Sequence, residues 1–282
     1  MVKSSSLFNE CTEKLNESGN DNSLAEVKWI FQSVIGNSSI FAFETLSDEQ
    51  AENIRSIINK RCEGYPLQYL LGEWEFYGYP FIVNENVLIP RPDTETLIEN
   101  VKDIVKREKL NAPKIADLCS GSGCIAVTLK KEIPDACVTA VELSEKAVAV
   151  IEKNAELNKA DINIVNADVL KEETARMLAD FDIIVSNPPY LTQEDMDTLQ
   201  TEVTHEPSLA LFGGNDGLDF YRAMTPLWKN SLKKGGWLLY EYGMGQHDDV
   251  KNILEHNNFE NIEICRDLAG IFRTSSAQKT ED

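Results

Sequence analysis

Hydrophobic and polar positions divide the chain into a first part with helical periodicity and a second part in which strands and helices alternate. Up to about position 72 the apolar residues recur at helical spacing, as in Ala51, Ile54 and Ile58, and strand signals are few. Ser47 and Gln50 precede this run at the spacing of a capping box. The pattern therefore predicts a small helical bundle over residues 1–72.

Residues 73–90 have a different character, with turn residues between closely spaced aromatic side chains. Flexible linkers are rarely so aromatic, and a punctuated segment of this kind is typical of a β-hairpin. We expect a hairpin that joins two domains. The aromatic residues on either side of Gly78 are Trp74, Phe76, Tyr77, Tyr79 and Phe81.

From Arg91 onward, short apolar runs alternate with amphipathic stretches, which predicts a mostly parallel, doubly wound α/β sheet of Rossmann-like type. The polar tail over residues 275–282 is expected to be frayed. Strands are expected over 114–118, 137–142, 162–166, 181–186, 236–242 and 261–265, and helices over 94–107, 122–131 and 145–158.

The strand predicted over 181–186 runs into Asn187-Pro188-Pro189-Tyr190. Prolines stop a strand because they donate no ladder hydrogen bond, and they push the preceding residue towards extended geometry. Asn187 and Tyr190 are thus expected on a stiff backbone at the carboxyl edge of the sheet, where ligands of open α/β folds bind. A carboxamide and a ring fixed there suit a planar amide or amino group. A proline-rich strand exit with a surface tyrosine is the structural alternative.

A loop of small residues follows the strand over 114–118 and opens a helix. Small residues let the backbone approach a ligand closely, and the free N–H groups at a helix start favour a carboxylate or phosphate. A tight strand–helix turn would use the same residue types. The loop consists of Asp117, Leu118, Cys119, Ser120, Gly121, Ser122 and Gly123.

Polar groups also end the next three strands. Glu142 ends the second strand, where an acid can accept hydrogen bonds from ribose hydroxyls. Asp168 follows the third strand, where it could meet an adenine amino group, and Asn187 follows the fourth. Each acid alone could be a solvated strand end. Four consecutive strands nevertheless deliver these groups to one edge, which favours a ligand site.

A nicotinamide site is the main competitor for the loop. The Gly-x-Gly-x-x-Gly pattern has Ala126 at its last position, which is a permitted variant. Asp117, however, lies just before the glycines, where it could pair with a ligand amine. Nicotinamide cofactors have no such amine, whereas S-adenosylmethionine has one.

Taken together, the loop, the acids and Asn-Pro-Pro-Tyr resemble a class I S-adenosylmethionine-dependent methyltransferase of the amino-methylating branch. The stretch from Leu88 to Thr96 resembles the Arg-Pro-x-Thr-Glu signature of the HemK/PrmC family, whose members methylate the glutamine of the Gly-Gly-Gln motif in peptide chain release factors. Residues 205–218 and 267–273 resemble the same family. The resemblance runs from about residue 60 to 274. Cys119 and Ser120 stand where this family usually has Gly-Thr.

The resemblance implies a release-factor-recognition domain over 1–72, a hairpin linker over 73–90 and a catalytic domain over 91–282. It implies methylation of the glutamine side-chain nitrogen N5. S-adenosyl-L-methionine is the implied cofactor, and the implied contacts to it are Asp117, Cys119, Ser120, Gly121, Ser122, Gly123, Glu142, Asp168, Val169 and Asn187.

On the acceptor side, we expect the Asn187 side-chain oxygen and the Pro188 carbonyl to accept the two hydrogens of the glutamine amide. Tyr190 is implied to pack against that planar amide. The expected catalytic residues are therefore Asn187, Pro188 and Tyr190, and Pro189 joins them in the substrate site.

Charge narrows the choice of acceptor. The chain carries 27 basic and 47 acidic residues, a formal net charge of −20, and such a field repels nucleic-acid phosphates. Duplex DNA is therefore not expected as a partner. This disfavours the main alternative, an adenine or guanine amino-methyltransferase, because such an enzyme needs phosphate contacts and usually flips its target base. A non-catalytic binding module would not need the intact tetrapeptide.

The cysteines and histidines bear on metal binding and on the cellular compartment. The six cysteines and three histidines show no zinc-ligand spacing, so no metal is expected. Free thiols fit a reducing compartment. No signal-like or membrane-length apolar run is present. We therefore expect a cytoplasmic monomer that does not bind membranes and whose partner is the release factor.

Overall fold

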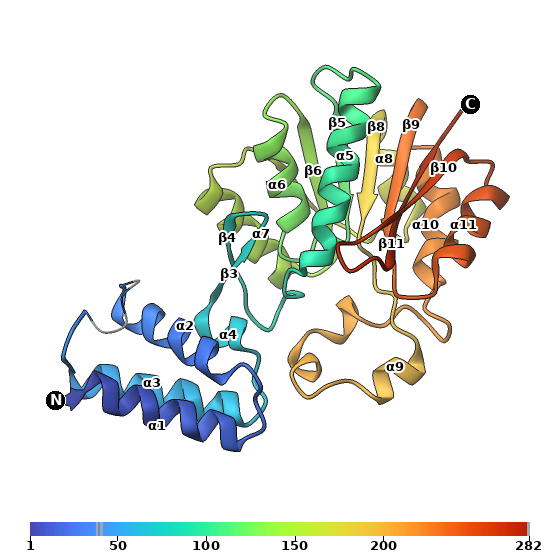
Figure 1. Cartoon of the computed structure of the whole chain (residues 1–282). Helices are drawn as coiled ribbons and strands as arrows, with labels where there is room; N and C mark the ends of the chain where they lie inside the picture. Colours follow the sequence, from blue (N-terminus) through green and yellow to red (C-terminus); the bar gives the residue numbers. More distant parts are fainter. Residues whose placement is uncertain (38, 40–41, 281–282) are drawn as a thin grey trace. The chain divides into compact units, whose positions relative to one another are not determined.

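The computed structural model describes residues 1–37, 39 and 42–280 (Figure 1). The chain separates into two compact units. One consists of Met1–Glu73 together with Gln200–His205, and the other of Trp74–Leu199 together with Glu206–Asp282.

The first unit is helical, as the sequence predicts. Its helices pack around an apolar core that includes Leu7, Ile30 and Ile54. The Ser47 hydroxyl accepts from the Gln50 N–H and the Gln50 side chain accepts from the Ser47 N–H, so the predicted capping box is confirmed. The elements are the paired strands β1 (Val2–Lys3) and β2 (Thr45–Leu46) and the helices α1 (Ser4–Glu17), α2 (Ser23–Ile35), α3 (Asp48–Cys62) and α4 (Leu67–Leu71).

The segment Gln200–His205 completes the first unit although it lies far along the chain. Arg61 forms two hydrogen bonds with Glu26 of α2 and a third with Glu202, at 2.9 Å. The rings of Tyr65 and His205 lie 4.1 Å apart between centroids. One arginine therefore fastens this segment, which includes the turn η2 (Val203–His205), to the helices.

A hairpin forms where the sequence predicts one, over residues 73–82 of the predicted 73–90. Strands β3 (Glu73–Phe76) and β4 (Tyr79–Ile82) pair through the two-residue turn Tyr77-Gly78. Both turn residues have positive φ, 53° and 75°, as a type I′ hairpin turn requires.

A seven-stranded sheet forms the centre of the second unit, in the order β10-β11-β9-β8-β5-β6-β7. Five neighbouring strands, from β9 to β7 in that order, run parallel, and β11 is antiparallel to both of its neighbours. The strands are β5 (Lys114–Leu118), β6 (Cys137–Glu142), β7 (Asn163–Asn166), β8 (Phe181–Ser186), β9 (Leu232–Glu241), β10 (Glu260–Arg266) and β11 (Phe272–Gln278).

Helices cover both faces of this sheet and bury a separate apolar core on each (Figure 1). One face carries α5 (Glu95–Arg107), α6 (Cys124–Glu132) and α7 (Glu145–Asn158). The other carries α8 (Glu172–Met177), α10 (Asp219–Lys229) and α11 (His247–His256). The predicted doubly wound α/β class is thus confirmed. The remaining short elements are η1 (Pro92–Thr94), α9 (Gln193–Asp197) and η3 (Ser208–Ala210).

The prediction of a frayed tail is wrong for residues 275–278. Residues up to Gln278 belong to β11, which pairs with β9 on one side and β10 on the other. Ser275 and Ser276 are buried between these two strands, where their backbone groups find partners although their side chains are polar. The end of the predicted tail, residues 281–282, lies outside the described residues.

Among the residues that the structure describes, no helix combines the length and the apolar character needed to cross a lipid bilayer.

Candidate active site

The carboxyl ends of β5, β6 and β8 lie at the topological switch point of the sheet, where the strand order reverses. Strand β5 lies between β6 and β8, so the loops that follow these three strands are neighbours. This is the position at which open α/β folds bind ligands. The Ser186 hydroxyl donates to the Leu118 carbonyl at 2.6 Å and ties the end of β8 to the end of β5.

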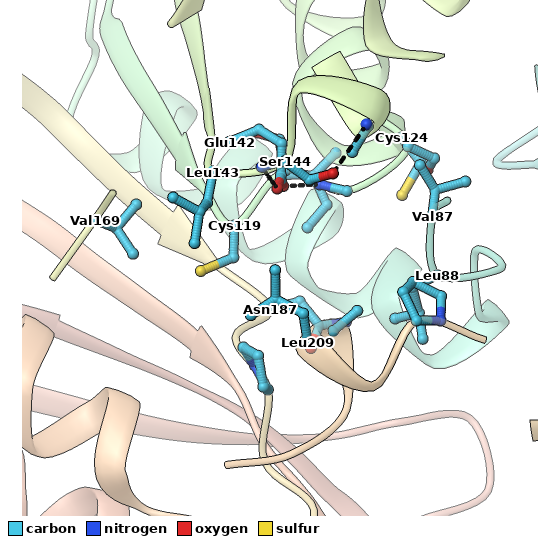
Figure 2. Close-up of a pocket in the computed structure, with 18 of the residues that line it drawn as sticks. Val87, Leu88, Cys119, Cys124, Glu142, Leu143, Ser144, Val169, Asn187 and Leu209 are labelled. Atoms are coloured by element: carbon cyan, nitrogen blue, oxygen red, sulfur yellow. Dashed lines mark hydrogen bonds between the residues drawn. The ribbon is translucent and has the colours of Figure 1, made fainter. Parts of the chain in front are cut away.

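A cavity of about 220 Å³ opens at this edge (Figure 2). In the view of Figure 2, Glu142 lies above the cavity, Asn187 and Leu209 below it, and Leu88 to the right. Nine of the predicted site residues line the cavity: Cys119, Ser120, Gly121, Ser122, Glu142, Asp168, Val169, Asn187 and Pro189. The other four, Asp117, Gly123, Pro188 and Tyr190, are not part of its lining.

The glycine loop owes its shape to residues with left-handed backbone. Gly123 caps α6 with φ of 78°, and a Cβ at this position would lie 3.0 Å from Ile151 Cγ2. Cys119 also adopts a left-handed conformation, with φ of 61°. Glycine adopts this conformation without strain, whereas a side chain there costs about 1 kcal/mol or more. The strained residue, Cys119, stands where the family that the sequence resembles usually has glycine.

Asp117 lies beneath this loop and is completely buried. Its Oδ2 accepts from the Ala126 N–H at 3.2 Å, and its Oδ1 has no hydrogen-bond partner among the described residues. Burial raises the pKa of Asp117 from 3.8 to about 7, against the opposing effects of the nearby Ser120 hydroxyl and of the hydrogen bond from the Ala126 N–H. An unsatisfied buried carboxylate oxygen fits a cationic ligand group such as an ammonium.

Glu142 and Asp168 are anchored by backbone groups. The Glu142 carboxylate accepts from the N–H groups of Gly121 and Ser144, at 2.9 and 2.8 Å (Figure 2). Asp168 Oδ1 accepts from the Leu170 N–H at 2.9 Å. A carboxylate offers about four lone-pair sites, so both acids keep acceptor capacity for ligand hydroxyl or amino groups.

Asn187 lies on the cavity wall directly after β8. Its Nδ2 donates to the Thr94 hydroxyl at 3.3 Å. Within residues 1–37, 39 and 42–280, no hydrogen bond reaches Asn187 Oδ1 or the Pro188 carbonyl. Both oxygens are therefore available to a ligand, whereas the Asn187 nitrogen is already engaged.

Tyr190 packs into the second core, next to the cavity lining but not within it. Burial raises the pKa of its hydroxyl, so the ring stays neutral. The Gln246 side chain donates to its carbonyl at 3.0 Å. Its predicted packing against a substrate amide stays a prediction.

The segment after α9 holds the tetrapeptide in place. Leu191 N–H donates to the Leu211 carbonyl at 2.9 Å, and Gly213 N–H donates to the Leu191 carbonyl at 2.8 Å. A Cβ on Gly213 would come within 2.6 Å of the Pro189 carbonyl oxygen. Only glycine permits this close approach, so the turn and the tetrapeptide form one tightly packed unit.

Sequence reasoning did not assign several residues that shape the site. Thr94 and Arg91 line the cavity, and the buried Glu206 accepts hydrogen bonds from Arg91 and from the Ile89 N–H. Glu241 lies buried at the end of β9. The stretches around Thr94 and Glu206 carried a signal only as family resemblance. Glu241 carried the signal of an acid near the end of the strand predicted over 236–242, but no site role was assigned to it.

Comparison with known proteins identifies relatives along the whole chain. Residues 6–72 match the PrmC N-terminal domain, and residues 92–211 match the Methyltransferase small domain. The chain is 36% identical over 282 residues to a release factor glutamine methyltransferase from Fusobacterium nucleatum, covering 97% of this chain and 78% of that protein. The chain belongs to the release factor glutamine methyltransferase family.

A second relative with the same name, from Geobacter sulfurreducens, is 38% identical over 266 residues, which cover 92% of this chain and 90% of the relative. The predicted family is therefore confirmed. Among solved structures, a methyltransferase from Pyrococcus furiosus aligns with a TM-score of 0.53 at 15% identity, covering 73% of this chain and 91% of that one. This likeness confirms the methyltransferase fold.

Proposed function

We propose that this protein transfers the methyl group of S-adenosyl-L-methionine to the side-chain nitrogen N5 of the glutamine in the Gly-Gly-Gln motif of peptide chain release factors. The observation that carries the proposal is the intact Asn187-Pro188-Pro189-Tyr190, of which Asn187 and Pro189 line the cavity, in a chain whose relatives are named release factor glutamine methyltransferases. The cytoplasm is the proposed setting, and a monomer the proposed state.

The residues beneath and around the glycine loop suit the cofactor. At the cavity wall, Glu142 would hold the ribose hydroxyls and Asp168 the adenine amino group. Asp117 lies beneath the loop and outside the lining, and its unsatisfied oxygen is proposed to accept from the ammonium group. Cys119, Ser120, Gly121, Ser122, Gly123 and Val169 would shape the surrounding surface. The bound cofactor supplies a sulfonium methyl that its positive charge already activates.

The acceptor needs precise positioning, because the nitrogen lone pair of a glutamine amide is delocalised into its carbonyl. Asn187 Oδ1 and the Pro188 carbonyl would accept the two amide hydrogens and aim the nitrogen at the methyl group. The same oxygens favour the positive charge that develops on the nitrogen during transfer. The proton leaves to water after transfer.

Residues 1–72 are proposed to recognise the release factor. A partner with basic surface suits a chain whose net charge is −20. Deletion of residues 1–72 should raise the KM for the release factor. The same deletion should have a smaller effect on the kcat for a short Gly-Gly-Gln peptide.

The proposal is tested by incubating the protein with methyl-labelled S-adenosylmethionine and either purified release factor, ribosomal RNA or duplex DNA. Label should enter the release factor alone, and only when its glutamine is intact. A release factor with Gln→Ala in the Gly-Gly-Gln motif is the matched control. Label in nucleic acid would instead support the alternative, an adenine or guanine amino-methyltransferase.

A further inference from the structure

The orientation of the Asn187 side chain decides what it can offer a substrate. A carboxamide presents an acceptor on one end and two donors on the other. Rotated by half a turn, Asn187 would point N–H groups at the N–H groups of an incoming amide. Something in the protein must therefore fix the oxygen towards the cavity.

Thr94 is placed to do this. It is the last residue of the turn η1, only 2% exposed, and its hydroxyl oxygen accepts from Asn187 Nδ2 at 3.3 Å. The two residues are 93 positions apart in the chain. No described residue donates to Asn187 Oδ1. The contact with Thr94 therefore holds the nitrogen end of the amide and leaves the oxygen end free.

Glu241 lies on the same side of Asn187. In the parallel pairing of β8 with β9, Ser186 is opposite Tyr240, so the next residues, Asn187 and Glu241, are neighbours. Glu241 is 1% exposed, and its Oε2 has no hydrogen-bond partner among the described residues. Burial raises its pKa to about 7, and the neighbouring Thr94 side chain, Arg273 and Asn187 oppose that rise. In its ionised form the Glu241 carboxylate only accepts hydrogen bonds, and that form would also select the nitrogen end of the amide.

Charged groups on the neighbouring elements hold this arrangement. Arg273 of β11 pairs with Asp93 of η1 at 3.3 Å and with Asp267 at 3.2 Å. Arg273 also stabilises the charged form of Glu241, whereas Asp93 opposes it. The arginine thus fastens the turn that carries Thr94 to the sheet edge that carries Glu241.

We propose that Thr94 and Glu241 are positioning residues for Asn187. They hold its side-chain amide with the nitrogen towards themselves and the oxygen towards the substrate glutamine. The inference rests on the proposed function for its kinetic consequence, but the locked amide is a property of the protein alone. Each part is open to its own experiment.

The kinetic experiment compares Thr94→Val, Thr94→Ser and Glu241→Gln in the full chain. Thr94→Val keeps the shape and removes the hydroxyl, whereas Glu241→Gln introduces an NH₂ group that could donate to the Asn187 oxygen and reverse the amide. For both variants we expect kcat to fall about tenfold to a hundredfold, because misplacement of one positioning group has costs of this order. The cofactor Kd, measured by calorimetry, should stay within about twofold, and Thr94→Ser should restore most of kcat.

The structural experiment needs no substrate. In ¹⁵N-labelled protein, the Asn187 side-chain NH₂ signal is assigned by its loss in Asn187→Asp. Its hydrogen exchange should be slow in the wild type and in Thr94→Ser, and clearly faster in Thr94→Val and Glu241→Gln, at unchanged melting temperature. If either Thr94→Val or Glu241→Gln has a lowered melting temperature, the exchange rate of the other variant decides.

If Thr94→Val and Glu241→Gln kept the kcat of the wild type and slow exchange of the Asn187 NH₂ group, the inference would be overturned. The proposed function would stay intact. A wild type that labels no release factor would overturn the proposed function, and the exchange rates would still decide whether the amide is locked. A rise in cofactor Kd that accounts for the whole loss of activity would assign both residues to cofactor binding and overturn their positioning role.

Discussion

The two sides of the cavity are built differently. The acid side is formed by Asp117, Glu142 and Asp168 with the loop Cys119–Gly123. Each of its carboxylates accepts from backbone N–H groups in the loops and the helix start that follow β5, β6 and β7. On the amide side, formed by Asn187, Pro188, Tyr190, Thr94 and Glu241, side chains from distant segments hold one another. Variants on the acid side should therefore change cofactor affinity, and variants on the amide side should change turnover.

The largest effect is expected for Asn187→Ala. It removes the oxygen that we propose as acceptor for the substrate amide, so kcat should fall about a hundredfold to a thousandfold, as for the loss of a group that stabilises developing charge. The cofactor Kd should stay within about twofold, as measured by calorimetry. Full activity of this variant would sink the assignment of the amide side.

Asp117→Asn tests the acid side in the same way. Loss of one charged hydrogen-bond partner should weaken cofactor binding by about tenfold to a hundredfold, with a smaller effect on kcat at saturating cofactor. Calorimetric titration measures the Kd. A change confined to kcat would show that the two sides do not divide the work as proposed.

The same residue predicts a dependence of stability on pH. The pKa of Asp117 is about 7 in the folded protein and ordinarily 3.8, so between these values the folded state binds more protons than the unfolded state. Its contribution to stability without cofactor is therefore greatest below the ordinary pKa and declines as pH rises through about 7. Melting curves from about pH 5 to 8.5 should show this decline in wild type and a smaller one in Asp117→Asn. Parallel profiles would contradict the burial argument.

Gly213→Ala tests how tightly the amide side is packed. The new methyl group would meet the Pro189 carbonyl oxygen at 2.6 Å and Tyr190 Cα at 2.7 Å. We expect a loss of about 1–3 kcal/mol in the free energy of unfolding, which is typical of overpacking, and a lower kcat. Gly245→Ala is the comparison for backbone strain without overpacking, because a Cβ there meets nothing within 4 Å but φ is +90°. Wild-type stability and kcat in Gly213→Ala would count against a packed tetrapeptide.

The smallest effect concerns the backbone of the acid side. Cys119 has φ of 61°, which a β-branched residue tolerates worst. Cys119→Val should therefore be less stable than Cys119→Gly by about 1–2 kcal/mol, measured by denaturant unfolding. The reverse order would show that side-chain packing outweighs backbone strain at this turn.

The contrast between the two sides also explains what the sequence could predict. Strands β5, β6 and β8 begin and end at the predicted residues, because buried parallel strands are continuous apolar runs with clear ends. The acids at those ends follow directly, and so does their meeting at one edge of the sheet. The acid side could therefore be predicted from strand ends and loop composition.

The amide side was accessible only in part. Asn187 stood out because two prolines follow it, but its contact with Thr94 joins residues 93 positions apart. Glu241 shares its environment only through the pairing of β8 with β9. Strand β11, which carries Arg273, was missed because its polar residues Thr274, Ser275 and Ser276 are buried by neighbours on both sides, and hydrophobic patterning does not reveal this. Side-chain partnerships of this kind depend on tertiary packing.

The most direct test of the central claim is tandem mass spectrometry of a purified release factor after incubation with this protein and S-adenosylmethionine. The account predicts one added methyl group on the side-chain nitrogen of the Gly-Gly-Gln glutamine, present with the wild type and absent with Asn187→Ala. An unmodified glutamine in the wild-type reaction, or a methyl group on another residue, would contradict it.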